Sequence, residues 1–211
     1  MNKKIIIFCI IFILIIILIF FIKNNYKNLK LGNNIINQSA DKIKENILNI
    51  ESYEAKVKIE IKSNKNTNTY EAIQKYHKEK NLYKQEITAP ESIAGIVFQY
   101  DGSNLQIKNT KLNLNKIYEN YNYIGNNELS LNAFIEDYKN NDNNIYESDK
   151  EIILETAVKN NNKYRAIKRL YISKSTNLPT KMEIQDNSQN TLVYILYNEI
   201  EINKLEKEQI N

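Results

Sequence analysis

The stretch that decides the fold is ITAPESIAGIVFQYDGSNLQI, residues 87–107. It contains one of the chain's two prolines, two of its four glycines and the pair Asp101-Gly102, which is typical of a tight turn. Apolar residues alternate on both sides of that pair, at Ile96, Phe98, Tyr100, Leu105 and Ile107. This pattern predicts a β-hairpin with one buried face. Because the stretch carries no reactive group, it indicates a protein that binds or positions something.

Working outward, alternation predicts strands on both sides of this hairpin. The clearest is residues 53–61, where Tyr, Ala, Val and Ile alternate with Glu and Lys without exception. Further strands are expected at residues 69–78, 82–88, 112–118, 151–159, 163–173, 180–186 and 191–203. The turns between them are short, so neighbouring strands are expected to run antiparallel.

Two segments have helical periodicity instead. Apolar residues recur at steps of three and four at Ile36, Ala40, Ile43, Ile47 and Ile50. The second segment holds Leu131, Phe134, Ile135 and Tyr138, with Ser130 as the expected N-cap. The predicted fold class is therefore α+β: a strongly curved antiparallel sheet, a half-barrel of about nine to ten strands, covered by the two helices.

The N-terminus predicts a membrane anchor. Residues 5–22 carry no polar side chain except Cys9, and would form about 27 Å of helix, close to the roughly 30 Å of a bilayer core. A cleaved signal peptide is the alternative, but small residues do not follow the apolar run. Cys9 lies too early for a lipobox, and no second cysteine is present for an intramolecular disulfide.

These patterns give four expected regions: a signal anchor or transmembrane helix at 1–22, a juxtamembrane linker at 23–32, the folded domain at 33–205 and a polar tail at 206–211. The short N-terminal tail and the large remainder favour a single-pass protein of the cell membrane with its domain on the extracytoplasmic side.

Chemistry-bearing residues are few. His77 is the only histidine and is expected on the strand face opposite Tyr76, as a surface residue. Cys9 falls in the apolar run, and no glycine-rich phosphate loop or calcium loop occurs. We therefore expect no catalytic residue, cofactor or metal. The net charge of +4 comes from Lys and Glu that alternate, which indicates a solvated surface and not a nucleic-acid site.

Tyrosines are the remaining candidates for binding. The chain has 15 of them and no tryptophan, and most suit strands. Tyr118, Tyr121 and Tyr123 lie beside a predicted loop, where they are candidates for an exposed aromatic patch that contacts a partner.

One arrangement of turn residues resembles a known family. The pattern Pro-Glu-x-x-x-Gly, five residues, then Asp-Gly is matched by Pro90, Glu91, Gly95, Asp101 and Gly102. A late Asn-Leu-Pro turn is matched by Asn177, Leu178 and Pro179. These motifs resemble Gram-positive relatives of the LolA/LolB lipoprotein-carrier fold, most closely the germination lipoprotein family GerS. One departure is that GerS-like proteins are lipid-anchored, whereas this chain has the pattern of a transmembrane anchor.

The resemblance implies a non-enzymatic protein that works with a cell-wall amidase, an N-acetylmuramoyl-L-alanine amidase, in spore cortex modification or germination. The space between forespore and mother cell is then one expected location. The alternative is a carrier of lipid or lipoprotein acyl chains, since a half-open sheet under helices can hold an apolar ligand. A homodimer formed by exchange of a long strand such as residues 191–203 at a sheet edge is a further alternative.

Overall fold

The computed structural model describes residues 40–63, 65–109, 111–121, 129–162 and 164–203. The chain divides into two compact units, residues 1–43 and 44–211. The predicted anchor, linker and polar tail lie outside the described residues. Within the described part of the chain, no helix is long and apolar enough to cross a lipid bilayer.

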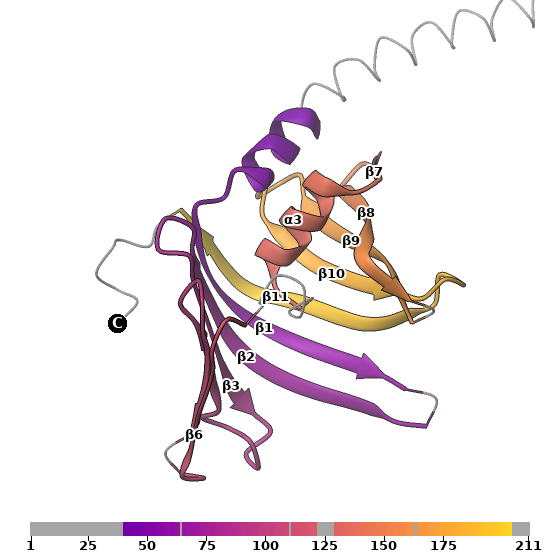
Figure 1. Ribbon diagram of the computed structural model, residues 1–211. Coiled ribbons are helices and arrows are strands. Elements are labelled where there is room, and N and C mark those ends of the chain that lie inside the picture. Colours follow the sequence, from indigo (N-terminus) through magenta and orange to yellow (C-terminus); the bar gives the residue numbers. More distant parts are fainter. Residues whose placement is uncertain (1–39, 64, 110, 122–128, 163, 204–211) are drawn as a thin grey trace, which may run out of the picture. The chain divides into compact units, whose positions relative to one another are not determined.

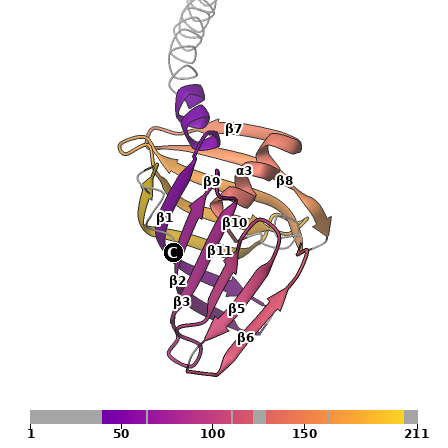
Figure 2. The same cartoon turned by 60° about the vertical axis from the view of Figure 1, so that its left-hand side comes forward.

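The second unit is built on one antiparallel sheet of 11 strands, in the order β6-β5-β4-β3-β2-β1-β11-β10-β9-β8-β7. The strands are β1 (Ser52–Lys62), β2 (Thr67–His77), β3 (Leu82–Ala89), β4 (Val97–Tyr100), β5 (Leu105–Asn109), β6 (Leu114–Tyr118), β7 (Asn143–Glu147), β8 (Glu151–Asn162), β9 (Arg165–Ser173), β10 (Pro179–Gln185) and β11 (Thr191–Ile202). Figures 1 and 2 show that the sheet is strongly curved. It is not closed, because β6 and β7 are its two edges.

The topology is that of two meanders joined along their first and last strands. Strands β1–β6 follow one another in space, as do β7–β11, and β1 pairs with β11 at the centre. The predicted curved antiparallel sheet is confirmed, with one strand more than expected. The extra strand is β7, in a segment for which no strand was predicted from the sequence. The predicted hairpin stretch lies toward the β6 edge of the sheet. Strand β11, which was expected to exchange at a sheet edge, is an interior strand.

Strand β1 shows why these residues form a half-buried sheet. Tyr53, Ala55, Val57 and Ile59 are all at most 2% exposed, whereas the alternate positions are half-buried or exposed. The residue period of a strand matches this alternation, so one face of β1 contributes to the core and the other meets water.

Helix α3 (Leu131–Asn140) lies on the concave side of the sheet (Figure 1). The side chain of Ser130 caps it as predicted, accepting a hydrogen bond from the backbone N–H of Ala133 at 3.3 Å. Its predicted apolar face is buried, with Leu131 and Phe134 fully inaccessible. Beneath this helix lie completely buried side chains of the second meander, among them Leu154, Leu170, Ile172 and Met182.

The other helix in the described residues spans 40–48. Of its predicted stripe, Ile47 is buried, as is Ile50 just after the helix. Ile36 lies outside the described residues.

Candidate functional site

The concave face of the first meander carries a row of tyrosines. Strand pairing places Tyr53 opposite Tyr76, Tyr76 opposite Tyr83, and Tyr83 opposite Tyr100. The row continues through Leu105 to Tyr118 on β6. Its two ends differ in exposure, since Tyr53 is fully buried and Tyr118 is 38% exposed. In-register aromatic pairs stabilise a sheet, and here they line one face of strands β1–β4 with aromatic side chains.

A polar network lies next to the buried end of this row. The Tyr53 hydroxyl donates to Asn132 Oδ1 of α3 at 3.2 Å, and the Tyr83 hydroxyl donates to Gln85 Oε1 at 2.9 Å. Gln74 Nε2 donates to the same Gln85 oxygen at 3.0 Å. Burial raises the pKa of Tyr53 well above its usual value, so its hydroxyl stays a hydrogen-bond donor.

Two groups of the concave face have no partner among the described residues. They are Gln74 Oε1, on a fully buried side chain, and the hydroxyl of Tyr197, which is 8% exposed. Burial also raises the pKa of Tyr197. Buried polar atoms are normally paired. Two unpaired polar atoms beside β1–β3 are therefore unusual for a core whose only role is to stabilise the fold.

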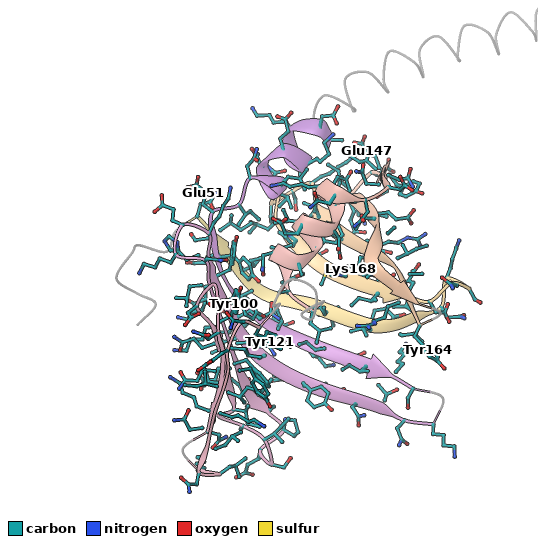
Figure 3. All side chains as sticks on the ribbon, viewed as in Figure 1. Glu51, Tyr100, Tyr121, Glu147, Tyr164 and Lys168 are labelled. Atoms are coloured by element: carbon teal, nitrogen blue, oxygen red, sulfur yellow. The ribbon has the colours of Figure 1, made fainter. Side chains whose placement is uncertain are left out.

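A buried ion pair fastens α3 to the second meander. Lys168 Nζ of β9 donates to Asp137 Oδ2 of α3 at 2.7 Å, and Lys168 is fully buried (Figure 3). This pair was not predicted from the sequence, although a signal is present. Lys168 takes an inward position in the alternation of Ala166, Leu170 and Ile172, where a charge needs a buried partner.

Exposed apolar side chains gather at the two edges of the sheet. Six large hydrophobic residues are exposed in the described part of the chain, and five of them lie on or next to the edge strands. Leu112, Ile117 and Tyr118 belong to the β6 edge, at 55%, 57% and 38% exposure. Ile145 and Tyr146 belong to the β7 edge, at 38% and 46%. Edge strands also present unpaired backbone groups, so each edge can accept another chain.

The predicted aromatic patch maps to the β6 edge. Tyr118 and Tyr121 lie together, with ring centroids 6.3 Å apart, and Lys116 Nζ lies 4.9 Å from the Tyr118 ring centroid. The backbone N–H of Tyr121 donates to Ser103 O in the Asp101-Gly102 turn at 2.8 Å. Tyr123 lies outside the described residues. The structure therefore brings two of the three tyrosines together beside an exposed edge.

The predicted turn residues occupy the ends of strands. Gly95 and Gly102 have φ angles of +83° and +96°, and Asn177 has +58°, all in the left-handed region. A Cβ on Gly102 would lie 2.9 Å from Asn81 Nδ2. Asp101 Oδ1 accepts hydrogen bonds from the backbone N–H groups of Asn104 and Ser103, which lower the pKa of this carboxyl.

Each of the two prolines lies at an end of a strand. Pro90 follows β3 after a cis Ala89–Pro90 peptide bond, and Pro179 is the first residue of β10.

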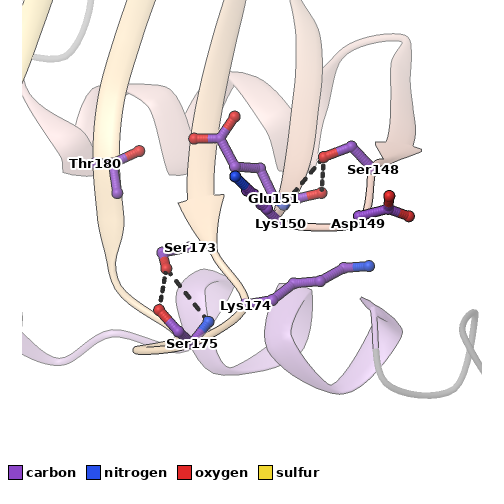
Figure 4. Close-up of a pocket in the computed structure, with 8 residues that line it drawn as sticks. All are labelled: Ser148, Asp149, Lys150, Glu151, Ser173, Lys174, Ser175 and Thr180. Atoms are coloured by element: carbon purple, nitrogen blue, oxygen red, sulfur yellow. Dashed lines mark hydrogen bonds between the residues drawn. The ribbon is translucent and has the colours of Figure 1, made fainter.

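A groove of about 750 Å³ lies at the turns between β7 and β8 and between β9 and β10 (Figure 4). The hydroxyl groups of its serines form hydrogen bonds within these turns. Ser148 Oγ accepts from the Glu151 backbone N–H at 3.1 Å, and Ser173 Oγ lies 2.8 Å from Ser175 Oγ. Lys174 forms an ion pair with Glu147. These hydrogen bonds and the ion pair stabilise the turns, which explains the polar side chains that form them.

His77 differs from its prediction as a surface residue. It is 6% exposed, and its Nδ1 has no partner among the described residues. It lies at the end of β2 between Ser52 and Leu82 of the flanking strands, which bury it. In the described residues, no three His, Cys, Asp or Glu side chains group in a way that could hold a metal ion.

Comparison with models of known protein families shows to which family the chain belongs. The model of the family described as sporulation protein YdcC-like matches residues 2–210. The chain belongs to the YdcC-like sporulation family. Among curated proteins, no sequence matches it.

Solved structures share the fold of this YdcC-like protein. An uncharacterized conserved protein from Thermus thermophilus has a TM-score of 0.54 at 15% identity, covering 81% of this chain and 91% of that one. A chain in the structure of the CwlD amidase from Clostridioides difficile in complex with the GerS lipoprotein has a TM-score of 0.51 at 27% identity, covering 76% and 92%.

A LolA superfamily protein from Nitrosomonas europaea is a more distant structural match, with a TM-score of 0.42 at 14% identity over 79% of this chain and 94% of that one. The resemblance that the turn motifs predicted is confirmed by the family match and by the chain of the CwlD–GerS complex.

Proposed function

We propose that this YdcC-like protein is a non-enzymatic, membrane-anchored protein whose extracytoplasmic domain binds a cell-wall amidase and supports its activity in spore cortex modification or germination. The observation that carries the proposal is the 27% identity to a chain of the CwlD–GerS complex, over 76% of this chain. Membership of a sporulation family supports the same setting.

The β6 edge is the surface we assign to the amidase. It combines the most exposed aliphatic side chain of the two edges, Ile117, with the adjacent Tyr118 and Tyr121. Aromatic residues and exposed apolar area are what protein interfaces use as anchors. Ile117 pairs with Gln106, and Tyr118 with Leu105, so the strand offers a side chain on each face of the sheet together with its free backbone edge.

The anchor is part of the proposal because residues 5–22 have the length and composition of a membrane span. In this arrangement the domain stays at the membrane surface and holds the amidase near its wall substrate. The absence of a lipobox distinguishes this tether from a lipid anchor.

The alternative function, carriage of acyl chains, finds little support in the interior. The space beneath α3 is filled by side chains, including Phe134, Leu154 and Leu170 at 0% exposure. A cavity between α3 and β2–β4 has a volume of about 200 Å³ and is lined by Lys, Asn and Glu as well as Tyr. This is smaller and more polar than the roughly 300–1,000 Å³ typical of sites for apolar ligands.

The direct test is to purify the full chain in detergent and titrate it with the CwlD-like amidase encoded in the same genome. We expect a stable complex by size-exclusion chromatography with light scattering, and faster amidase turnover of isolated peptidoglycan. A catalytically inactive amidase variant controls for hydrolysis of the wall by contaminants. If the two proteins elute separately at micromolar concentration and turnover is unchanged, the proposal is wrong.

A further inference from the structure

We propose that the small cavity between α3 and strands β2–β4 is a binding site for one ring of a neutral sugar. The cavity measures about 200 Å³, and its lining includes Tyr76, Lys78, Tyr83, Tyr100, Asn132 and Glu136. These residues come from three neighbouring strands, their connecting turn and one helix, all within the second compact unit. Tyr100 is labelled in Figure 3.

The walls of the cavity are aromatic and fixed. Tyr76, Tyr83 and Tyr100 are successive members of the in-register tyrosine row. The hydroxyl of Tyr83 donates to Gln85 Oε1 at 2.9 Å and that of Tyr100 donates to Gly102 O at 2.7 Å. Both rings are therefore held before any ligand arrives. An aromatic ring offers an apolar face against which the C–H groups of a sugar ring can pack.

The helix supplies the polar groups. Asn132 and Glu136 are four residues apart on α3, so they lie on one side of the helix. Asn132 Oδ1 accepts the hydroxyl of Tyr53 at 3.2 Å, which orients the amide so that Nδ2 can donate. Burial, with the charge of Glu136, raises the pKa of Tyr76 and keeps its hydroxyl a donor. A carboxylate acceptor, an amide donor and a hydroxyl thus converge beside the rings.

The charge balance selects for a neutral ligand. Glu136 is half-buried on the helix side, and Lys78 is exposed. An anion would meet the Glu136 carboxylate, whereas a cation would meet the Lys78 ammonium group. Because these two opposite charges line the same cavity, neither sign of ligand charge is favoured, and the lining groups suit hydroxyls that donate and accept hydrogen bonds. The volume lies below the range of drug-sized sites, so a single ring fits and a long chain does not.

This site is separate from the β6 edge that we assign to the amidase. Tyr76, Asn132 and Glu136 lie on β2 and α3, while Ile117 lies on β6. Sugar binding can therefore fail while amidase binding persists, and the reverse also holds.

The test is saturation-transfer NMR on the full chain in detergent micelles, with chitotriose, maltotriose and cellotriose as probes. We expect transfer to at least one trisaccharide, strongest at the protons of a single ring. Tyr76→Phe and Glu136→Gln are expected to weaken the affinity by about tenfold each and keep the side-chain shape, because the first removes a hydroxyl and the second replaces a charged acceptor by a weaker neutral one. Tyr146→Phe, which changes a tyrosine at the β7 edge, is the matched control and should bind as the parent does.

Three outcomes overturn the proposal. The first is the absence of transfer to all three trisaccharides when circular dichroism shows a folded chain. The second is equal affinity in the parent, Tyr76→Phe and Glu136→Gln. The third is displacement of the sugar signal by a zwitterion such as glycine at equal concentration, which would identify the cavity as an amino-acid site.

Discussion

Two rows of side chains on the same face of the sheet differ in how deeply they are buried. On the second meander, Leu154, Leu170, Met182 and Ile195 are in register across β8 to β11, and each is 0% exposed. On the first meander, Phe98 is paired with Gln85 and Ile107, and all three are only half-buried.

The difference lies in α3, which lies over β8 and is bonded to β9 through the ion pair of Asp137 with Lys168. Both rows contain apolar strand residues, so strand sequence alone does not decide burial. The covered half supplies most of the core, and the open half keeps apolar surface available for ligands and partners. Stability and binding are thus assigned to different ends of one sheet.

The largest effect is expected from breaking the ion pair under α3. Asp137→Asn leaves Lys168 charged and buried without its carboxylate, which should lower the free energy of unfolding by about 3–5 kcal/mol. The comparable change in the first meander is Glu54→Gln, which breaks the half-exposed pair of Glu54 with Lys75. It should cost less than about 1 kcal/mol. Urea unfolding followed by circular dichroism measures both.

A double variant sharpens this result. Asp137→Leu with Lys168→Met replaces the pair by apolar groups and should recover most of the lost stability. Equal losses for Asp137→Asn and Glu54→Gln would contradict the distinction between the covered and open halves.

The next effect concerns packing. Leu170→Ala creates a cavity in the covered row and should cost about 2–5 kcal/mol. Ile107→Ala truncates a half-buried residue of the open row, where water can fill the space, so its cost should be clearly smaller. The measurement is the shift in the midpoint of thermal or urea unfolding. A loss for Ile107→Ala as large as that for Leu170→Ala would show that the open face is also core.

The smallest effect concerns pH and the β7 edge. Burial tends to raise the pKa of Glu155, but hydrogen bonds from Arg169, Tyr146 and Asn144 outweigh it and lower the pKa. The stability that Glu155 contributes is therefore present above the carboxyl's unfolded-state pKa and is lost as the pH falls through its lower folded-state pKa. Glu155→Gln should flatten the acid side of a plot of stability against pH. An unchanged acid slope in this variant would contradict the assigned network.

Much of the fold could be predicted from local patterns. The alternation from Tyr53 to Ile59 and the Ser130 N-cap each correspond to what the structure contains, because period and capping are local properties. Strand β7 was missed because its Asn-rich sequence has turn composition, and it becomes a strand by pairing with β8.

Fewer features of the candidate site could be predicted from the sequence. The pairing of β1 with β11 joins residues about 140 positions apart, and no local pattern reports it. The in-register tyrosine row and the burial of His77 depend instead on the exact register between consecutive strands, which alternation alone does not give. Lys168 is the exception, since a charge at an inward strand position is visible without a structure.

The most direct test of the central claim compares the two edges in amidase binding. The dissociation constant of the full chain for the CwlD-like amidase is measured for the parent, for Ile117→Asp at the β6 edge and for Ile145→Asp at the β7 edge. Both replaced side chains are exposed, so neither change should unfold the domain. The account predicts at least tenfold weaker binding for Ile117→Asp and unchanged binding for Ile145→Asp. Equal affinity for all three, or loss only with Ile145→Asp, would contradict it.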